Sequence, residues 1–454
     1  MRTMTATLPE VRPAPGGAPL FGHLHRMLND PRGFFESLRG HGPVVTIGLG
    51  PIRAYVVNDP ALTHQILTKD VRKLEKGVAF EKSAPFLGEG LLNSREPQHM
   101  AHRRLVQPAF HHRRVAAYAE QMREAAEQRV GAWRDGQTVD LDLEIHAFAV
   151  AVVCRALFSS GLGDTVAVAV EESLPVLLKG VTRRIAFPVG WLERLPTPGN
   201  RRFERARRRL DETLSGVIAE YEARGADGGT GDGDLMAMLL QARPHLSDRQ
   251  IHDEAMALFL GGVETARDVL SWTCHLLSTH RDVQERLAAE VGEVLDARPL
   301  GHEALDELGY LRRVLTEGLR LYPPAWLFTR RAVADVDLGG HLVPAGSHVL
   351  FSVHAVQRDP AVYPEPDRFD PDRWAGDAGA RIPRISYLPF GAGNRSCIGE
   401  PFAWEEMMIF MAALVRRWSL HPAPGETIRP ARSPMLQPRR LPMVVRERTR
   451  SREN

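Results

Sequence analysis

One cysteine lies in a glycine-rich loop directly before an apolar helix pattern. Gly391 and Gly393 precede Cys397, and Gly399 follows it two residues later. Glycine permits backbone angles and close approaches that are closed to other residues. The apolar run Phe402–Trp418 predicts a helix, whose free N-terminal N–H groups and dipole would favour a thiolate at the cysteine. A buried, persistent thiolate is an iron ligand more often than a nucleophile, and the alternative is a buried structural cysteine in a glycine-rich turn.

Two further residues of this loop suit the same chemistry. Phe390 would shield the sulfur from water, and Arg395 places a cation where it would bind an acidic group of the same ligand. The pattern Phe390-Gly-x-Gly-x-Arg395-x-Cys397-x-Gly399 resembles the haem-ligand signature of the cytochrome P450 monooxygenases. Six specified positions arise by chance in a chain of this length with a frequency of about one in 10⁵ or less, given ordinary composition.

A second candidate site lies in the middle of a long apolar helix pattern. Ser247–Gln250 is a capping box, and the helix should run from there to about His280. The segment Gly261-Gly-Val-Glu264-Thr265 places two glycines inside it, each costing roughly 1 kcal/mol against alanine, which a ligand plane packed on the backbone would offset. The segment resembles the family's oxygen-binding kink, which implies that Thr265 holds a water and Glu264 belongs to a proton relay. The alternative is a capped core helix with a buried threonine.

Three basic residues are candidates for binding the haem propionates. His99 and Arg103 are four residues apart and so share a helix face, and bacterial members of the family similarly carry a His-x-x-x-Arg pair. Arg330 matches the family position of another propionate-binding arginine, whereas Arg331 would face the opposite side of the strand. The alternative for the first pair is a solvated basic helix that includes residues 111–114.

A Glu-x-x-Arg pair is the remaining motif. Glu317 and Arg320 share a face of the helix pattern Leu311–Leu321, which two prolines end. The segment Pro366–Phe369 resembles the family's second arginine segment, which implies that Arg368 completes a Glu–Arg–Arg cluster. Its role would be structural, because a buried carboxylate between two guanidiniums is fully paired.

The elements that must position these residues read mainly as helices. Short strands are expected at Val44–Leu49, Ile52–Val57, Leu327–Ala334, Val336–Leu338 and His348–Ser352, and a final hairpin within Pro430–Arg446. Further helices are expected from Pro60 to about Leu67 and through most of residues 115–225. Residues 72–96 and 225–233 are predicted to be loops.

The pattern and the resemblance together imply a mainly α fold with small β-sheets, of the α+β class. The family fold is a triangular prism with a long central helix over the haem. We therefore predict a single cytochrome P450 domain over residues 1–454, with residues 1–20 as a flexible lead-in and 447–454 as a tail.

Composition excludes several classes of protein. The net charge of +2 gives no strong field that would point to nucleic acid or an acidic membrane, and the basic run 201–209 is interleaved by Phe203 alone, which favours a solvated helix face. Three widely spaced cysteines argue against a disulfide framework or a zinc site. The first thirty residues hold four prolines and no long apolar run, so we expect no signal peptide, no membrane anchor and a cytoplasmic protein.

The resemblance implies a haem b enzyme that uses O2 as co-substrate. No dinucleotide or flavin fingerprint follows the cysteine helix, so electrons should pass from NAD(P)H through a ferredoxin reductase and a ferredoxin. Residues 111–114, Arg416 and Arg417 would offer positive charge to that acidic partner. We expect a monomer.

The substrate is expected to be a hydrophobic small molecule, because the residues expected to line its pocket are nearly all apolar. They are Phe86, Leu87, Ala257, Leu260, Gly261, Ala325, Trp326, Leu327 and Met435. The run Val353–Trp374 resembles bacterial sesquiterpene oxidases, which implies a terpenoid of secondary metabolism, and a polyketide or macrolide is the alternative. The acid–alcohol pair disfavours a peroxygenase, and a non-catalytic haem sensor or carrier is the other open interpretation.

Overall fold

The computed structural model describes residues 11–158, 162–186, 193–226, 235–243, 245–431, 433 and 435–449. The chain divides into two compact units, each built from three separate stretches. Unit 1 comprises Met1–Glu81, Arg320–Arg368 and Gly376–Cys397, and unit 2 comprises Lys82–Leu319, Phe369–Ala375 and Ile398–Asn454. The expected mainly α fold with small sheets is confirmed. The single domain expected over residues 1–454 stays a prediction.

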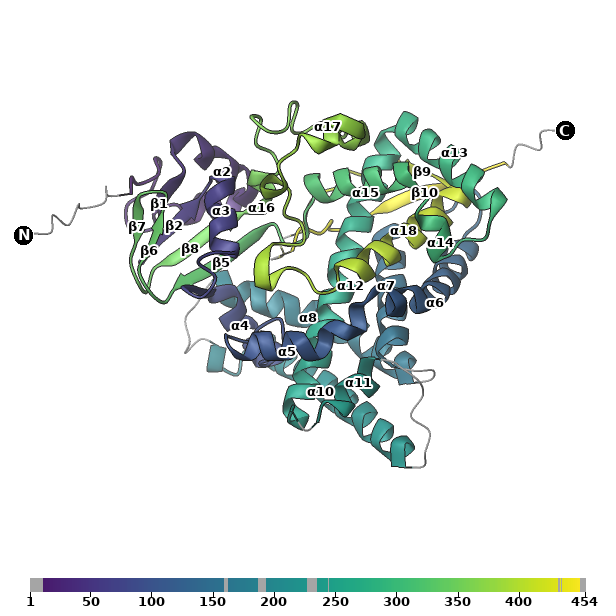
Figure 1. The fold of residues 1–454 in the computed structure, drawn as a ribbon, viewed down its shortest axis with the longest axis horizontal. Helices are drawn as coiled ribbons and strands as arrows, with labels where there is room; N and C mark the ends of the chain where they lie inside the picture. Colours follow the sequence, from purple (N-terminus) through teal and green to yellow (C-terminus); the bar gives the residue numbers. More distant parts are fainter. Residues whose placement is uncertain are drawn as a thin grey trace, which may run out of the picture. The chain divides into compact units, whose positions relative to one another are not determined.

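Unit 1 is built on a five-stranded sheet with the strand order β1-β2-β8-β5-β3 (Figure 1). Its strands are β1 (Val44–Leu49), β2 (Ile52–Val57), β3 (Leu74–Lys76), β5 (Leu327–Ala332) and β8 (His348–Ser352). The predicted β1–β2 hairpin is confirmed at both strands, and β8 lies parallel to β2. A second hairpin joins β6 (Val336–Leu338), which was predicted, to β7 (His341–Val343), which was not.

Short helices and buried aliphatic side chains complete unit 1. The helices are α1 (Leu24–Asn29), α2 (Pro31–Leu38), α3 (Pro60–Leu67), α16 (Val353–Val356) and α17 (Gly376–Ala380). As the sequence predicted, α3 begins after Asp59, whose Oδ1 accepts the Leu62 N–H at 2.9 Å. Val57, Val349 and Phe351 belong to the buried core beneath the sheet.

Unit 2 is helical, with one small sheet of order β4-β10-β9. Its strands are β4 (Thr138–Asp140), β9 (Trp418–Pro422) and β10 (Pro442–Glu447), and its helices are α5 (Gln98–Val106), α6 (His112–Gly131), α7 (Leu141–Leu157), α8 (Leu162–Ala186), α10 (Pro198–Ala226), α11 (Leu235–Gln241), α12 (Asp248–Thr279), α13 (Arg281–Ala297), α14 (His302–Leu305) and α18 (Glu400–Arg417). Two more helices cross the boundary between the units, α4 (Val78–Leu87) and α15 (Gly309–Leu321).

The 32-residue helix α12 is the centre of unit 2. It packs against α7, α10, α11, α13, α18 and β9. The capping box predicted at its start is confirmed, because Ser247 Oγ accepts the Gln250 N–H at 3.3 Å and Gln250 Oε1 accepts the Ser247 N–H at 2.9 Å. A long buried helix of this kind is suited to hold residues of a site rigidly.

Two expectations about the elements are wrong. Residues 72–96 are not a loop, because they contain β3, which pairs with β5, and α4, which tolerates Pro85 inside it. The last strand, β10, does not form a hairpin within Pro430–Arg446. It pairs with β9 and β4, while residues 429–439 are held by two backbone hydrogen bonds of 2.8 Å and a bridge between Pro430 and Pro438.

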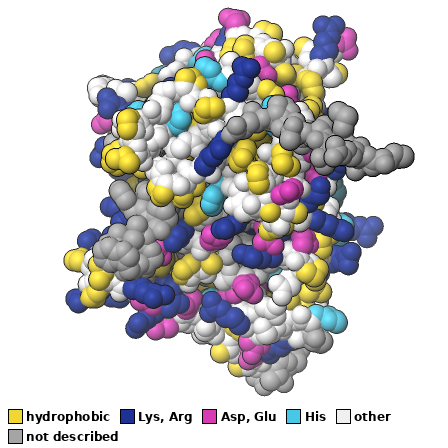
Figure 2. Space-filling view, turned by 90° about the vertical axis from the view of Figure 1, so that its left-hand side faces the viewer, with side chains coloured by type: hydrophobic (Ala, Val, Ile, Leu, Met, Phe, Trp, Pro, Cys, Tyr) yellow, Lys and Arg dark blue, Asp and Glu magenta, His cyan; other side chains and the backbone are white. Residues whose placement is uncertain are grey.

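The molecular surface carries charges of both signs. The basic segment 201–209 lies in α10, where Arg207 pairs with Glu204 at 2.6 Å, so the expected solvated helix face is confirmed. Basic and acidic side chains are interspersed with apolar ones on the face in Figure 2, in keeping with a net charge of +2. None of the described helices is long and apolar enough to span a membrane.

Candidate active site

The cysteine loop of unit 1 is a tight structure whose glycines are required by its geometry. The Cys397 N–H donates to the Phe390 carbonyl oxygen at 2.8 Å, which closes the loop. Gly391 and Gly393 have φ angles of +70° and +69°, a region that L side chains disfavour. A Cβ on Gly393 would lie 2.2 Å from the Leu67 carbonyl oxygen, so the loop lies directly against the end of α3. The loop is therefore shaped by packing within unit 1.

Two buried side chains anchor the chain that leads into this loop. Gln357 Oε1 accepts the Leu388 N–H at 2.9 Å, and its Nε2 donates to the Arg320 carbonyl oxygen at 3.0 Å. The hydroxyl of Tyr363 donates to the Ser386 carbonyl oxygen at 2.9 Å. Gln357 and Tyr363 are both fully buried, so these bonds are strong positional constraints.

The thiol of Cys397 is exposed, whereas those of Cys154 and Cys274 are buried. Burial raises the pKa of Cys274, which keeps that thiol protonated and inert. Gly399, two residues after Cys397, is the N-cap residue of α18, and Pro401 stands in the first turn. The sequence placed the start of this helix at Phe402, two residues late, and it predicted a buried thiolate, whereas Cys397 is exposed. The binding of iron by Cys397 stays a prediction.

Arg330 of unit 1 is a buried arginine that senses the charge of the half-buried Arg395. Arg330 is 5% exposed, and its Nη1 donates to the Thr329 carbonyl oxygen at 3.0 Å. Burial, and then the charge of Arg395, lower the pKa of Arg330 to about 10. An anion stabilises a buried guanidinium that has a second cation nearby, and the two propionates of a haem are such anions. The accessible thiol and this pair of cations are therefore a donor set that fits a haem.

The glycine pair of α12 has two different environments in unit 2. A Cβ on Gly262 would lie 2.8 Å from Val153 Cγ2, so this glycine allows α7 to approach α12 closely. Gly261 is exposed, although most of α12 is buried, and a Cβ there would meet no atom within 4 Å. Helix packing thus explains Gly262. For Gly261, a ligand packed beside the backbone stays a prediction.

Thr265 and Glu264 are adjacent in α12 but point in different directions. The Thr265 hydroxyl donates to the Gly261 carbonyl oxygen at 2.7 Å, a bond that bends helices locally. The Glu264 side chain is 3% exposed and lies 3.0 Å from Arg267 Nη2 through its Oε2. Burial raises the pKa of Glu264, and the charge of Arg267 opposes this effect, so the protonated form is favoured more than in an exposed glutamate.

His99 and Arg103 share one face of α5, as their spacing predicted. His99 is buried, and its Nδ1 lies 2.9 Å from Glu96 Oε1, which orients the ring. Arg103 is half-buried. A solvated basic helix is therefore wrong for His99, and the binding of a propionate stays a prediction for both residues.

The prediction that Arg368 pairs with Glu317 is wrong. The side chain of Arg368 is 61% exposed and pairs with Glu365 at 3.0 Å. In unit 2, Glu317 is fully buried and contacts Arg373 Nε at 3.3 Å. Its other oxygen accepts the Trp374 indole N–H at 2.8 Å, so the second arginine of this motif lies five residues further along the chain than expected.

Arg320 is a fully buried structural arginine of unit 1, as expected from its position in the motif. Its Nη1 donates to the carbonyl oxygens of Gln357 at 3.0 Å and Pro366 at 2.7 Å. Its Nη2 donates to the carbonyl oxygen of Arg368 at 3.2 Å. The segment around Arg368 is therefore recognised through its backbone, which the sequence pattern could not reveal.

The residues expected to line the substrate pocket are distributed over both units. In unit 2, Leu87 and Ala257 are buried and Leu260 and Met435 are half-buried. In unit 1, Ala325 and Leu327 are half-buried.

Trp326 and Phe86 are the remaining two residues of the expected pocket. Trp326 is 7% exposed and packs edge-on against Phe35 of α2, with 6.0 Å between the ring centroids, so it belongs to the core of unit 1. The side chain of Phe86 lies outside the described residues.

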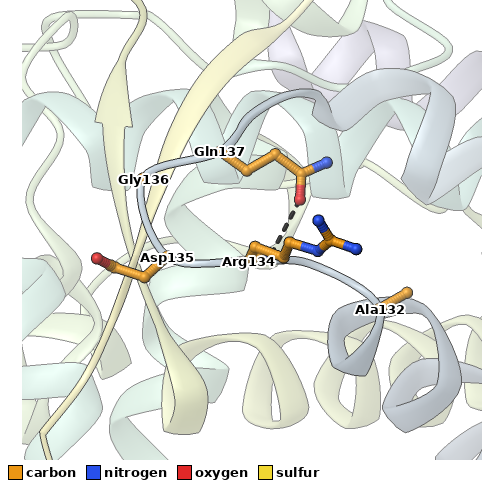
Figure 3. Close-up of a pocket in the computed structure, with 5 residues that line it drawn as sticks. All are labelled: Ala132, Arg134, Asp135, Gly136 and Gln137. Atoms are coloured by element: carbon orange, nitrogen blue, oxygen red, sulfur yellow. Dashed lines mark hydrogen bonds between the residues drawn. The ribbon is translucent and has the colours of Figure 1, made fainter.

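A hollow of about 500 Å³ lies at the turn between α6 and β4, away in sequence from every predicted site residue (Figure 3). It is lined by Ala132, Arg134, Asp135, Gly136 and Gln137. The Gln137 side chain accepts the Arg134 N–H at 2.9 Å, and Asp135 points away from it (Figure 3). These contacts stabilise a surface turn, and the hollow contains none of the chemistry predicted from the sequence.

Sequence reasoning overlooked a group of charges beside Glu264. Arg267 and Asp268 follow it by three and four residues in α12, and both are buried. Charged residues at positions where a central helix should be apolar were the available signal. Among the described residues, no group of three or more His, Cys, Asp or Glu side chains is arranged to hold a metal ion, so these charges need another explanation.

Comparison with known proteins relates the whole chain to one family. The family model described as Cytochrome P450 matches residues 13–445. Cyclooctat-9-en-7-ol 5-monooxygenase of Streptomyces melanosporofaciens is 39% identical over 440 residues, which cover 96% of this chain and 95% of that protein. Pentalenene oxygenase of Streptomyces avermitilis is 37% identical over 422 residues, which cover 92% and 93%.

A solved structure extends the likeness to three dimensions. The crystal structure of the cytochrome P450DA heme domain matches with a TM-score of 0.86 at 26% sequence identity. The match covers 97% of this chain and 98% of that one.

Proposed function

The chain belongs to the cytochrome P450 family and is a monooxygenase, and on that premise we propose that it hydroxylates a C–H bond of a hydrophobic terpenoid with O2 and electrons from a ferredoxin. The observation that carries the proposal is the accessible thiol of Cys397 on its glycine loop. A haem, when bound, supplies the activation of O2 and the oxidation of the substrate. The residues of the chain supply binding, orientation and protons.

In unit 1, Cys397 would hold the haem through its iron. The loop geometry supports this role, because the bond from its N–H to Phe390 holds the residue while the sulfur stays accessible. Arg330 and Arg395 would bind haem carboxylates, since two neighbouring guanidiniums favour an anion. Phe390 would limit the access of water to the sulfur.

In unit 2, Glu264 and Thr265 would handle protons. Thr265 has a hydroxyl whose own hydrogen goes to Gly261, so its oxygen is available as an acceptor for a water. Glu264, with its pKa raised by burial, would hold a proton for that water. His99 and Arg103 on α5 would bind haem carboxylates from this unit, and Gly399 would let α18 start close to the iron ligand.

The terpenoid substrate is supported by the named relatives and by the apolar character of the expected pocket residues. A polyketide or macrolide would instead require polar anchoring groups among those residues. A cytoplasmic location and a monomeric state belong to the same proposal.

The electron donor we propose is a ferredoxin, itself reduced by NAD(P)H through a reductase. Arg113 is an exposed cation at the start of α6 that supports docking of an acidic partner. Arg416 and Arg417, which the sequence also suggested, are paired with Asp296 at 3.1 Å and Glu447 at 3.2 Å and so offer less free charge.

Thiolate ligation is tested by the absorption spectrum of the reduced protein with carbon monoxide. We expect the strongly red-shifted Soret band of a thiolate-ligated haem, and its loss in Cys397→Ala. The matched control is Cys154→Ala, which removes a buried thiol and should keep the band. Wild-type protein that binds haem without this band would refute the proposal.

A further inference from the structure

A stripe of polar and charged residues runs along a buried face of α12. Glu264, Arg267, Asp268 and Ser271 follow the spacing i, i+3, i+4 and i+7, so they lie on one side of the helix. All four are buried. Burying charges is costly unless they are paired, so these residues need partners from a neighbouring element.

Arg267 is the only cation at the centre of this group among the described residues, and it contacts three carboxylates. Its Nη2 lies 3.0 Å from Glu264 Oε2 and donates to Asp268 Oδ1 at 3.1 Å. Its Nε lies 3.5 Å from Oδ1 of Asp142, in the first turn of α7. Nη2 also donates to Gln437 Oε1. One guanidinium therefore spans carboxylates of two helices.

His146 on α7 adds no second positive charge. Its Nδ1 lies 3.5 Å from Arg267 Nη1 and 3.7 Å from Glu264 Oε1. Burial, and then the charge of Arg267, lower the pKa of His146 to about 4. The imidazole is therefore neutral at neutral pH, and its Nδ1 faces the guanidinium as an acceptor.

The charges of the group do not balance if every carboxyl group is ionised. Three carboxylates against one guanidinium would leave a net charge of about −2 in a buried place, which is unfavourable. Burial is the largest influence on all three and raises the pKa of Asp142 and Glu264, and that of Asp268 furthest. Asp268 Oδ2 has no hydrogen-bond partner among the described residues. The excess of carboxyl groups over cations and their burial therefore favour protonated forms within the group.

The three carboxyl groups differ in their access to solvent. The side chain of Asp142 is 14% exposed, compared with 3% for Glu264 and none for Asp268. Ser271 Oγ donates to Asp142 Oδ1 at 3.0 Å, which ties this carboxyl group to α12. Asp142 is thus the carboxyl group of the three that is most accessible to water.

Other charged groups near Asp142 are engaged with each other. Asp140 Oδ2 lies 3.3 Å from Arg440 Nε, and its Oδ1 accepts the Leu441 N–H at 3.1 Å. Glu144, on the same turn of α7, is half-buried and has no contact with Arg267 recorded among the described residues.

We propose that Asp142 is the solvent-side proton donor to Glu264 and that Arg267 positions both carboxyl groups for this transfer. The inference rests on the proposed function, in which Glu264 supplies protons at Thr265. The proton leaves the carboxylic acid of Asp142 and binds the carboxylate of Glu264. Asp142 then takes a proton from bulk water, and no electron or carbon bond is involved.

Arg267 and Asp268 have supporting roles in this transfer. The three carboxylates raise the pKa of Arg267 against the effect of burial, so the guanidinium keeps its charge throughout. Asp268, which is fully buried, retains its proton and reduces the negative charge next to Glu264. Arg267 is a positioning residue, because it acts through the two carboxyl groups.

The first test needs no turnover. Infrared spectra of the haem-loaded protein, recorded against pH, report the C=O stretch of protonated carboxylic acids. We expect Asp142→Asn to remove a titrating band and Asp268→Asn to remove a band that persists through neutral pH. Ser271→Ala should shift the Asp142 titration to higher pH, because the serine hydroxyl lowers that pKa. The matched control Glu144→Gln should leave these bands unchanged.

The second test is turnover with a saturating ferredoxin. We expect Asp142→Asn to lower kcat about tenfold at unchanged KM and to increase the solvent isotope effect, a smaller loss than the roughly 10²-fold or more of a direct proton donor. Glu144→Gln should behave as wild type. Arg267→Lys, which keeps the charge but not the fork of donors, should lower kcat and shift the Glu264 band.

These outcomes separate the inference from the function on which it rests. If Asp142→Asn keeps wild-type kcat and isotope effect, or if no Asp142 band titrates, the proton route is wrong while the monooxygenase stands. If Asp142→Asn loses haem or does not fold, Ser271→Ala provides the test instead. An Asp142 titration that is unshifted in Ser271→Ala would refute the role of the contact between Ser271 and Asp142. A wild-type protein without the thiolate band refutes the proposed function alone, because the infrared titration does not depend on the iron ligand.

Discussion

The revised arginine motif leads to a comparison of two substitutions five residues apart, Arg373→Gln and Arg368→Gln. Arg373 is 10% exposed and contacts the fully buried Glu317. Arg368 is 61% exposed and pairs with an exposed Glu365. The two variants change the net charge equally, so any difference in stability reflects the environment of each side chain.

The expected magnitudes follow from burial. Arg373→Gln removes a charged donor from a carboxylate that keeps the Asp370 N–H at 3.1 Å and the Trp374 N–H at 2.8 Å. A hydrogen bond to a charged group contributes about 1.5–3 kcal/mol, and breaking a buried ion pair costs about 3–5 kcal/mol. We therefore expect a loss of about 3 kcal/mol in the free energy of unfolding. Arg368→Gln should cost about 0.5 kcal/mol or less, since its carbonyl oxygen, which accepts from Arg320, is unchanged.

The assay is urea-induced unfolding of the haem-loaded protein, followed by far-ultraviolet circular dichroism and by haem absorbance. Arg373→Gln should lower the midpoint clearly and Arg368→Gln should not. Equal losses in the two variants, or a greater loss in Arg368→Gln, would show that Arg368 is the partner of Glu317 after all. A third variant, Arg373→Lys, should recover only part of the loss, because lysine cannot reproduce the geometry of the guanidinium.

Two further predictions concern pH and the redox partner. Burial, and then Arg358, lower the pKa of His354 to about 4 from an unfolded value of 6.5, so stability should be lost as pH falls from 6.5 towards 4, by up to about 3 kcal/mol. The Nδ1 of His354 lies 2.7 Å from Arg358 Nη1 and its Nε2 lies 2.7 Å from Glu36, an arrangement that suits only the neutral ring. His354→Gln should reduce the dependence of the free energy of unfolding on pH, and a variant with the same pH dependence as wild type would contradict this. Reversing Arg113 and Arg114 to glutamate should slow reduction by ferredoxin at low salt, and stopped-flow rates equal to wild type would remove them from the docking site.

The sequence predicted the elements whose signals are local. The hairpin of β1 and β2, the start of α3 at Asp59 and the capping box of α12 all depend on residues within one or two turns of each other. It could not predict which arginine reaches Glu317, because both follow a proline–acid pattern and only tertiary packing separates Arg368 from Arg373. The same limit applies to β10, whose partners β9 and β4 lie far away in the chain.

Helix α12 contains residues that packing explains and charged residues that packing does not explain. Gly262 is explained by packing, because α7 could not approach with a Cβ 2.8 Å from Val153. Arg267 and Asp268 have no such explanation, because apolar side chains of similar volume at a buried site are often neutral or stabilising. Asp142 brings a third carboxyl group to the same guanidinium from a second helix. A group that costs stability and retains excess carboxyl groups has the properties expected of a proton store, and its position beside Glu264 indicates which residue it serves.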